Sequence, residues 1–434
     1  MNPGYLIFTL GCRTNQFESD CLARDLEAAG LTASGPEGPA ELVVVNTCTV
    51  TARADKQSRQ LIRRLARSHH QATLVVTGCL AQLEPESLAS MAGVSLVVGH
   101  SLQTELARLV KEEQRGLFVG PPQRRFNDFG PVPPQRRSRA LLKVQDGCDG
   151  VCAYCRVRLA RGPSRSLPPE RVLAVAEELK GAGFAEIVLT GTHLGGYGHD
   201  ADEPTDLAAL MERLLASGEG PRLRLSSLDP HEVSPQLLRV AAAAYGEGGR
   251  FCPHFHLPLQ SGDAGLLQSM KRPYDPDQLT ETIQSIRRLF PAAAIGADIM
   301  VGLPGEDEAA FQRTRRLIED LPLTYLHVFP FSPRPGTLAA RLPLRPAPAL
   351  ARVRAQEMRE LSRLKKEAFL AQGVGQPTEI IVESRRDRKT GLLTGVSPNY
   401  MTVLVDGPNT LFDQPLKVVG QQVVEGRLLA KRAG

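Results

Sequence analysis

Short apolar runs alternate with amphipathic stretches along residues 1–116 of the chain. The runs are rich in β-branched residues and are bounded by turn residues, which is typical of strands buried on both faces. The stretches between them carry apolar residues at helical spacing. Strand, helix, strand and helix in this order predict a parallel sheet with helices on both faces. The predicted strands are residues 5–12, 41–50, 72–81 and 94–100, and the predicted helices are residues 17–30, 54–68 and 86–93.

The same alternation continues on a larger scale over residues 139–371. Six candidate strands are each followed by a helical stretch or by the turn that leads to one. This pattern predicts a partial (β/α)6 barrel, because a complete (β/α) barrel has more units. In such barrels the chemistry lies at the carboxyl ends of the strands. The predicted strands are residues 140–147, 186–195, 222–230, 253–262, 294–305 and 325–333.

The last segment, residues 374–434, consists of short alternating strands separated by turns. It predicts a small antiparallel β-barrel of the size of an oligonucleotide-binding module. Residues 117–138 are rich in proline and arginine and are predicted to be a linker. The expected α/β fold therefore has three domains: a parallel-sheet domain over 1–116, a partial barrel over 139–371 and a small β-barrel over 374–434.

The composition is ordinary for a soluble globular protein, with 42% hydrophobic and 23% charged residues. Eight cysteines in 434 residues are too few for a disulfide framework, and their clustering indicates metal or redox chemistry in a reducing compartment. The N-terminus lacks a basic region before its apolar run, and no stretch approaches the length of a membrane span. We therefore expect a cytoplasmic protein without a membrane partner.

Positive charge is concentrated in three clusters, although the net charge of the chain is only +5. Such clusters suit a polyanion such as RNA, but a solvated surface explains any single one of them equally well. The clusters are residues 124–137, 351–366 and 385–389.

Three cysteines lie close together after the first strand of the predicted barrel, at Cys148, Cys152 and Cys155. Three thiolates on one loop can hold a cubane iron–sulfur cluster and leave its fourth iron free for another ligand. Zinc is the competing metal, but a structural zinc site needs a fourth protein ligand, and the next histidine is the distant His193. The pattern therefore favours a 4Fe-4S cluster.

Three further cysteines each follow a predicted strand of the first segment: Cys12, Cys48 and Cys79. The carboxyl ends of parallel strands lie on one edge of the sheet, where ligands bind, so these thiols can converge. We predict a second three-thiolate 4Fe-4S cluster there. Cys21, in a helix, and Cys252, before a strand, are predicted to be structural.

Two other pairs of polar residues are open to a simple structural explanation. Asn15 and Glu18 have the spacing of a capping box at the start of the first helix, although they also lie near Cys12. His254 and His256 are either satisfied polar groups of a strand or functional residues.

The segment CDGVCAYC (148–155) resembles the radical S-adenosylmethionine (SAM) motif, in which the open iron binds the cofactor. The segments LGCRTNQFESD, VVNTCTVTARADKQSRQ and VTGCLAQ resemble the N-terminal domain of the methylthiotransferases. LSSLDP, CPHFHLPLQSG, DIMVGLPGE and HVFPFSPRPGT resemble the central barrel of that family, and the last segment resembles its RNA-binding TRAM domain. The resemblance covers essentially the whole chain.

Three branches of this family act on different targets. The combination of NQFES, LSSLDP, HLPLQSG and HVFPFSPRPGT is most similar to the branch that modifies threonylcarbamoyladenosine beside the tRNA anticodon. One alternative is the isopentenyladenosine branch, which usually differs at LSSLDP. Another is the branch that modifies an aspartate of a ribosomal protein, which usually has Pro-Lys where this chain has Arg13-Thr14. An iron–sulfur carrier or scaffold is the non-enzymatic alternative, but a carrier needs no cofactor pocket.

The resemblance implies that the cluster on Cys148, Cys152 and Cys155 reduces SAM to a deoxyadenosyl radical, and that the second cluster carries the sulfur to be inserted. It also implies two partners, the tRNA anticodon loop and an electron donor protein. From their place at or near predicted strand ends, cofactor contacts are expected from Gly191, Ser227 and Gln260, and Arg161 and Arg165 are expected to hold the cofactor carboxylate or a substrate phosphate. Arg156 and Arg158 stand where the family usually has apolar residues, and the sequence assigns them no role.

Overall fold

The computed structural model describes residues 3–35, 38–130, 137–201, 205–216, 218–246 and 249–433. Part of the predicted linker, residues 131–136, lies outside these residues. Within the described part of the chain, no helix is long and apolar enough to cross a membrane.

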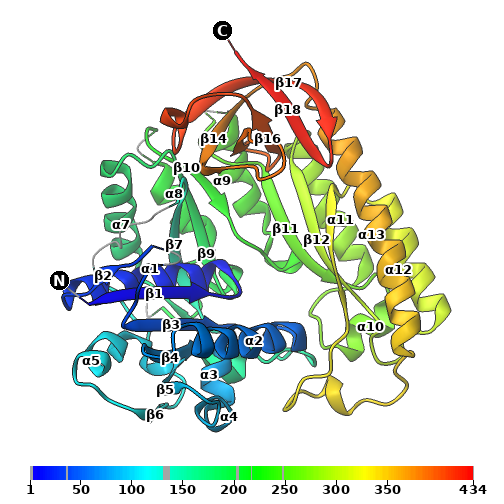
Figure 1. The fold of residues 1–434 in the computed structure, drawn as a ribbon. Helices are drawn as coiled ribbons and strands as arrows, with labels where there is room; N and C mark the ends of the chain where they lie inside the picture. Colours follow the sequence, from blue (N-terminus) through cyan, green and yellow to red (C-terminus); the bar gives the residue numbers. More distant parts are fainter. Residues whose placement is uncertain are drawn as a thin grey trace.

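The N-terminal segment forms a six-stranded parallel sheet with the order β2-β1-β3-β4-β5-β6, as the alternation predicts (Figure 1). The short edge strands β2 and β6 were not predicted, and β6 carries the sheet to Phe118. The strands are β1 (Gly4–Thr9), β2 (Thr32–Ala33), β3 (Leu42–Thr47), β4 (Thr73–Gly78), β5 (Val94–Gly99) and β6 (Gly116–Phe118).

Helices cover both faces of this sheet because its central strands are apolar on both sides. Val43 and Val45 of β3 pack on one face with residues of α2, α3 and α4, whereas Val44 packs on the other face with residues of α1 and α5. The helices are α1 (Arg13–Ala28), α2 (Ala52–Ser68), α3 (Cys79–Leu83), α4 (Pro85–Ala89) and α5 (Leu106–Lys111), with the 3-10 turn η1 (His100–Glu105) before α5.

All six strands predicted for the central segment are present and are parallel within their sheets. They follow chain order in two sheets, one containing β7, β9 and β10 with the short antiparallel β8, and the other containing β11, β12 and β13. The strands are β7 (Ala140–Asp146), β8 (Arg165–Ser166), β9 (Glu186–Gly191), β10 (Arg222–Leu225), β11 (His254–Gln260), β12 (Ala294–Val301) and β13 (Tyr325–Pro330).

The wall of strands is interrupted between β10 and β11. A single bridge joins Leu223 to Phe251, and the Cys252 N–H then donates to Leu223 O at 2.8 Å. The ladder stops at Pro253, which has no N–H to donate, and the His254 N–H turns back to Cys252 O at 2.7 Å. The six strands of the predicted partial barrel therefore lie in two sheets, which are joined near Pro253 by isolated hydrogen bonds.

Helices cover the outer face of these two sheets and enclose the largest apolar core (Figure 1). Phe255 and Leu257 of β11 join this core, so the alternating residues His254 and His256 face the opposite, inner side. The main helices are α6 (Val157–Arg161), α7 (Pro169–Gly181), α8 (Leu207–Leu215), α9 (Pro235–Gly246), α10 (Ala264–Ser269), α11 (Pro276–Leu289), α12 (Glu308–Asp320) and α13 (Pro348–Ala371), with the 3-10 turns η2 (Leu194–Gly196), η3 (Pro230–Glu232) and η4 (Ala339–Arg341).

The C-terminal segment is a closed five-stranded barrel, β14-β15-β16-β18-β17. Its strand pairs are antiparallel, as predicted, except β16 and β18, which are parallel. The strands are β14 (Pro377–Arg386), β15 (Leu393–Val396), β16 (Thr402–Val405), β17 (Pro415–Val424) and β18 (Arg427–Arg432), with the 3-10 turn η5 (Asn409–Leu411).

The turn between β15 and β16 docks this barrel onto the central sheets. The Tyr400 ring stacks on His254, with centroids 4.0 Å apart, and its hydroxyl accepts a hydrogen bond from Arg13 Nη2 at 3.2 Å. The fully buried Arg224 of β10 donates to the carbonyls of Ser397 and Pro398 at 3.1 and 3.0 Å. One short turn therefore contacts both the central sheets and the residue that follows Cys12.

We predict that Arg224→Met lowers the stability of the protein and loosens the C-terminal barrel. Arg224 also pairs with the fully buried Glu186 at 2.7 Å, and removing one partner of a buried pair costs about 3–5 kcal/mol. Thermal unfolding and limited proteolysis at residues 372–376 measure the effect. The matched control is Arg352→Met on an exposed position of α13, and equal unfolding midpoints for both variants would contradict the prediction.

Candidate iron–sulfur sites and the charge network between them

Cys148, Cys152 and Cys155 lie on the loop that follows β7, at the carboxyl end of the strand. The loop can turn there because Gly147 has φ +72°, and a Cβ at this position would lie 1.8 Å from Pro163 O. The Cys148 N–H donates to Gly162 O at 3.1 Å, and the Cys155 N–H donates to Cys152 O at 3.1 Å. These bonds hold the three thiols on one compact loop.

Several donors point at the sulfur atoms of this loop. The backbone N–H groups of Gly150 and Val157 lie 3.3 and 3.4 Å from the Sγ atoms of Cys148 and Cys155. The guanidinium of Arg272 reaches Cys152 Sγ at 3.1 Å. Donors of this kind stabilise the thiolate form, which is the form that binds iron.

Cys12, Cys48 and Cys79 lie at the carboxyl ends of the neighbouring strands β1, β3 and β4. Two glycines allow the loops to approach closely. A Cβ on Gly11, which has φ +101°, would lie 2.9 Å from Cys48 Sγ, and one on Gly78, with φ +94°, would overlap the backbone of the residue before Cys48. The structure therefore brings the three strand ends together at one edge of the sheet.

The surroundings of the two sets of thiols favour metal binding over the reactions of free thiols. Burial raises the pKa of Cys79 and of Cys155 to about 12, and it also raises the pKa of Cys48. Without a cation these thiols remain protonated at neutral pH, whereas iron coordination stabilises the thiolate. All six are free cysteines, so each set offers three sulfur ligands that fit a 4Fe-4S cluster.

A buried charge network fills the space between the N-terminal sheet edge and the loop after β7. Arg161 is its centre: Nη1 lies 2.8 Å from both Glu18 Oε1 and Asp146 Oδ1, and Nε lies 3.2 Å from Cys79 Sγ. Lys143 Nζ bridges the same two carboxylates at 2.8 Å each. The network consists of Glu18 and His100 from the N-terminal segment and of Lys143, Asp146, Arg161 and Arg165 from the central segment.

The charges of this network leave one positive charge in excess. Burial raises the pKa of Glu18 and of Asp146, but the neighbouring cations outweigh it and hold both values well below the usual range. Burial and Arg161 lower the pKa of His100, so its imidazole is neutral at pH 7. Three cations against two carboxylates leave a charge of +1, and Arg161 directs it at Cys79. Arg161 lowers the pKa of Cys79, but burial outweighs this effect and the pKa stays raised until a metal ion binds the sulfur.

The predicted capping box of α1 is wrong. The N-cap residue is Cys12, whose side chain makes no capping hydrogen bond, so Asn15 and Glu18 both lie inside the helix. Asn15 donates to the carbonyls of Leu10 and Thr47 at 2.9 and 3.0 Å, which ties the loops of Cys12 and Cys48 together. Glu18 turns inward because Arg161 and Lys143 bind its carboxylate more strongly than a helix terminus does.

The residues expected to contact the cofactor have different surroundings. Arg161 and Arg165 are buried, and their guanidinium groups are held by Asp146 at 2.8 and 2.7 Å. Ser227 Oγ lies 2.8 Å from His256 Nδ1. Gly191 and Gln260 end β9 and β11, and Gln260 has φ +66°, a value that non-glycine residues seldom adopt.

The two arginines without a predicted role differ from each other. Arg156 is buried, and its guanidinium lies 3.1 Å from Glu84 Oε1 and 3.5 Å from Thr49 Oγ1, so it joins the cysteine loop to the N-terminal segment. Arg158 stays near the surface and donates to Asp149 O at 3.2 Å. Arg334, which lies in the segment HVFPFSPRPGT and was given no role of its own, is buried and binds Asp55 at 2.6 Å and Thr49 Oγ1 at 2.8 Å.

The two histidines of β11 have separate environments. His254 is buried, and its Nε2 pairs with the Tyr325 hydroxyl at 2.8 Å, so this ring is a packed polar group of the strand. His256 instead meets Ser227 and His327 on the inner face of the sheet.

Comparison with known proteins shows the family to which the chain belongs. Residues 142–318 match the radical SAM superfamily, and residues 5–99 match a family described as "Uncharacterized protein family UPF0004". The chain is 32% identical over 419 residues to "Threonylcarbamoyladenosine tRNA methylthiotransferase MtaB" of Bacillus subtilis (strain 168), which covers 94% of this chain and 92% of the relative. The chain belongs to the radical SAM methylthiotransferase family.

Other methylthiotransferases and one solved structure extend the comparison. Identity is 34% over 406 residues to the protein of the same name from Aquifex aeolicus (strain VF5), with 92% of this chain and 96% of the relative covered. It is 30% over 432 residues to "tRNA-2-methylthio-N(6)-dimethylallyladenosine synthase" of Pelotomaculum thermopropionicum, with 96% of each covered. The radical SAM methyltransferase TsrM from Kitasatospora setae shares the fold, with a TM-score of 0.57 at 16% identity over 78% of this chain and 77% of that one.

For this methylthiotransferase we predict that Glu18→Gln lowers the free energy of unfolding by about 3–5 kcal/mol at pH 7, because the buried cations lose a carboxylate. The pKa of Glu18 is lower in the folded state, so its contribution is complete above the unfolded value of about 4.3 and is lost as pH falls through the folded value. The difference in unfolding free energy between the wild type and the variant should therefore decrease as the pH falls below about 4. Anaerobic urea unfolding at pH 7 and at a series of pH values below about 4 measures the change.

The control for this experiment is Glu86→Gln, at an exposed position of α4. It should change the unfolding free energy by less than about 0.5 kcal/mol. A Glu18→Gln protein as stable as this control would show that the charge network does not hold the two segments together.

Proposed function

We propose that this protein attaches a methylthio group to threonylcarbamoyladenosine in tRNA by radical SAM chemistry that uses two 4Fe-4S clusters. The observation that carries the proposal is the pair of three-thiol sites, one on the loop after β7 and one on the edge of the N-terminal sheet, on either side of one buried charge network. The curated relatives with 32–34% identity over most of their length carry the name of this activity.

The first cluster would be held by Cys148, Cys152 and Cys155, and the second by Cys12, Cys48 and Cys79. When bound, the clusters supply the electron for SAM cleavage and the sulfur for transfer. The protein itself supplies charge and enclosure. Arg272 donates to Cys152 and Arg161 donates to Cys79, so one sulfur atom of each set accepts a hydrogen bond from a guanidinium.

Cofactor contacts are proposed at Gly191 and Gln260, which stand at the ends of β9 and β11, on the side of the sheets where the Cys148 loop begins. Ser227, Arg161 and Arg165, which the sequence analysis also assigned to the cofactor, already have protein partners. We therefore assign the two arginines to holding the cysteine loop rather than to binding the SAM carboxylate.

The division into domains supports the tRNA substrate. We propose an N-terminal cluster domain, a central radical SAM domain and a C-terminal RNA-binding barrel, with boundaries near residues 118, 139 and 374. The anticodon loop would meet the C-terminal barrel and the basic helix α13, because single-stranded loops are where proteins read RNA and basic surfaces grip its backbone. An electron donor protein and a cytoplasmic location complete the proposal.

The two cluster sites should be separable by mutation. We predict that Cys152→Ala and Cys48→Ala each reduce the iron content of the reconstituted protein from about eight to about four atoms per chain. Only Cys152→Ala should abolish reductive cleavage of SAM, whereas Cys48→Ala should retain it and lose methylthiolation. Iron analysis and anaerobic detection of deoxyadenosine distinguish the two. Cys21→Ala, at a buried cysteine outside both sets, is the matched control and should retain full iron content and activity.

The substrate itself is tested in cells that lack this protein. We expect their tRNA to lose the methylthio group from threonylcarbamoyladenosine and to keep it on isopentenyladenosine. Mass spectrometry of tRNA nucleosides, with the gene restored as a control, measures both. Loss from isopentenyladenosine instead would assign the protein to the other tRNA branch, and an unchanged profile would exclude tRNA as its substrate.

A further inference from the structure

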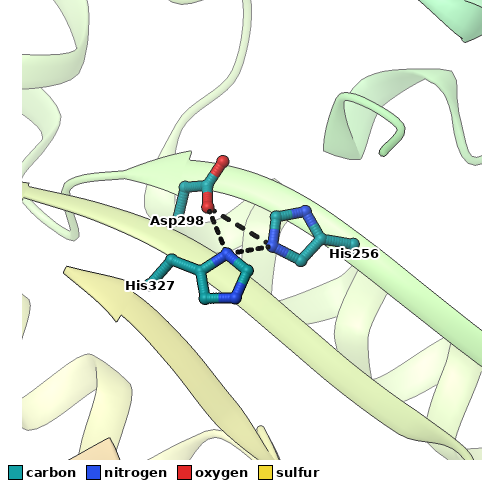
Figure 2. Close-up of side chains that lie close together, drawn as sticks. All are labelled: His256, Asp298 and His327. Carbon is teal, nitrogen blue, oxygen red and sulfur yellow. Dashed lines mark hydrogen bonds and ion pairs between the residues drawn. The ribbon is translucent and has the colours of Figure 1, made fainter. Parts of the chain in front are cut away.

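Three polar residues meet on the inner face of the sheet formed by β11, β12 and β13 (Figure 2). They are His256, Asp298 and His327, one from each strand. Asp298 and His327 are directly paired in the register. His256 is paired with Gly296, which lies two residues before Asp298 on the same strand. Their neighbours along the strands belong to the apolar core on the other face, so the alternation of the strands directs all three inward.

The three side chains present one donor atom each at the corners of a nearly equilateral triangle. His256 Nε2 lies 3.2 Å from His327 Nδ1, and each nitrogen lies 3.3 Å from Asp298 Oδ1 (Figure 2). Ligands about 2.1 Å from a metal ion are separated by about 3.0 Å in octahedral geometry and by about 3.4 Å in tetrahedral geometry. The triangle has the dimensions of one face of such a coordination sphere.

The chemistry of this triangle is that of a transition-metal site. Two imidazoles and one carboxylate are the ligands that select zinc or ferrous iron when further positions are left open. Ser227 Oγ lies 2.8 Å from His256 Nδ1, the nitrogen that faces away from the triangle. Metal-binding histidines usually donate this second N–H to an oxygen partner, which directs the other nitrogen at the metal.

Asp298 also lacks the partners that neutralise carboxylates elsewhere in the protein. The ion pairs found for it among the described residues are with His256 and His327 alone, and its side chain is 24% exposed. Two other groups with a similar composition differ in this respect. In the group of Glu18, His100 and Asp146, lysine and arginine bind the carboxylates, and in the group of His193, Asp229 and Glu232, Arg272 binds Asp229 at 2.5 Å.

We propose that His256, Asp298 and His327 bind one divalent transition-metal ion, with the remaining coordination positions open to water or to an oxygen ligand. Access is available from the side of His327, whose side chain is 55% exposed. The site shares no residue with the six cysteines of the two proposed clusters. It is therefore a third metal centre, which can be loaded without affecting the iron–sulfur sites.

The test uses the full-length protein with both clusters reconstituted and kept oxidised, without tRNA or SAM. Mn²⁺ is the probe, because it prefers nitrogen and oxygen ligands to thiolates and its unbound form is counted by electron paramagnetic resonance. The wild type should bind about one Mn²⁺ per chain. His327→Gln and Asp298→Asn should abolish this binding, and Ser227→Ala should weaken it by about 10-fold or more. Anomalous diffraction from a crystal soaked in Mn²⁺ should give a peak at the triangle.

The matched control is His70→Gln, at an exposed histidine outside the site, which should bind Mn²⁺ as the wild type does. His327 is exposed, so its substitution is compatible with folding, and equal melting temperatures verify this. Failure of the wild type to bind Mn²⁺, unchanged binding in His327→Gln, or an anomalous peak elsewhere would each overturn the proposal. None of these results depends on methyl transfer or on tRNA, so they leave the proposed function untouched.

Discussion

The arrangement of this molecule depends on the guanidinium of Arg161. It lies in the interior, where an unpaired charge is very costly, and it can be there only because Glu18 and Asp146 accept its hydrogen bonds. Glu18 comes from the first helix of the N-terminal segment, and Asp146 comes from the end of the first central strand. Neither segment can satisfy this charge alone, so the same ion pairs that neutralise it also dock the two segments.

This docking determines how the two sets of thiols lie relative to each other. One set begins two residues after Asp146, and Cys79 of the other set accepts a hydrogen bond from Arg161 itself. A second connection runs from Arg156, next to Cys155, to Glu84 and Thr49, the residue after Cys48. The two cysteine loops are therefore held by bonds between charged or polar side chains immediately beside the cysteines that are proposed to hold the clusters, and neighbours of this kind orient the ligands of a metal site.

Much of this structure could be predicted from local sequence patterns. The strand–helix alternation predicted the parallel sheet and all six central strands, because burial on both faces leaves a clear apolar signature. The position of Cys12, Cys48 and Cys79 after successive strands predicted their convergence. In contrast, Asn15 and Glu18 were assigned to a helix cap, since a short-range motif has the same spacing whether or not a distant arginine competes for its carboxylate.

The parts that sequence could not predict all depend on contacts between distant segments. Arg165 was assigned to the cofactor because its charge is visible in the sequence, whereas the carboxylate that neutralises it is not. Arg334 lies in a recognisable segment, but its partner Asp55 is 279 residues away in the chain and could not be read from that segment. The meeting of His256, Asp298 and His327 requires the register of three strands, which depends on where each strand begins rather than on any one motif.

The hydrogen bond from Arg13 to the hydroxyl of Tyr400 has a mechanical consequence. Arg13 is bonded covalently to Cys12, and Tyr400 sits in the turn by which the C-terminal barrel rests on the central sheets. The turn is thus connected to Cys12 through two side chains, Tyr400 and Arg13, and one peptide bond. The C-terminal barrel is therefore tied to the residue next to one of the cysteines proposed to hold the second cluster.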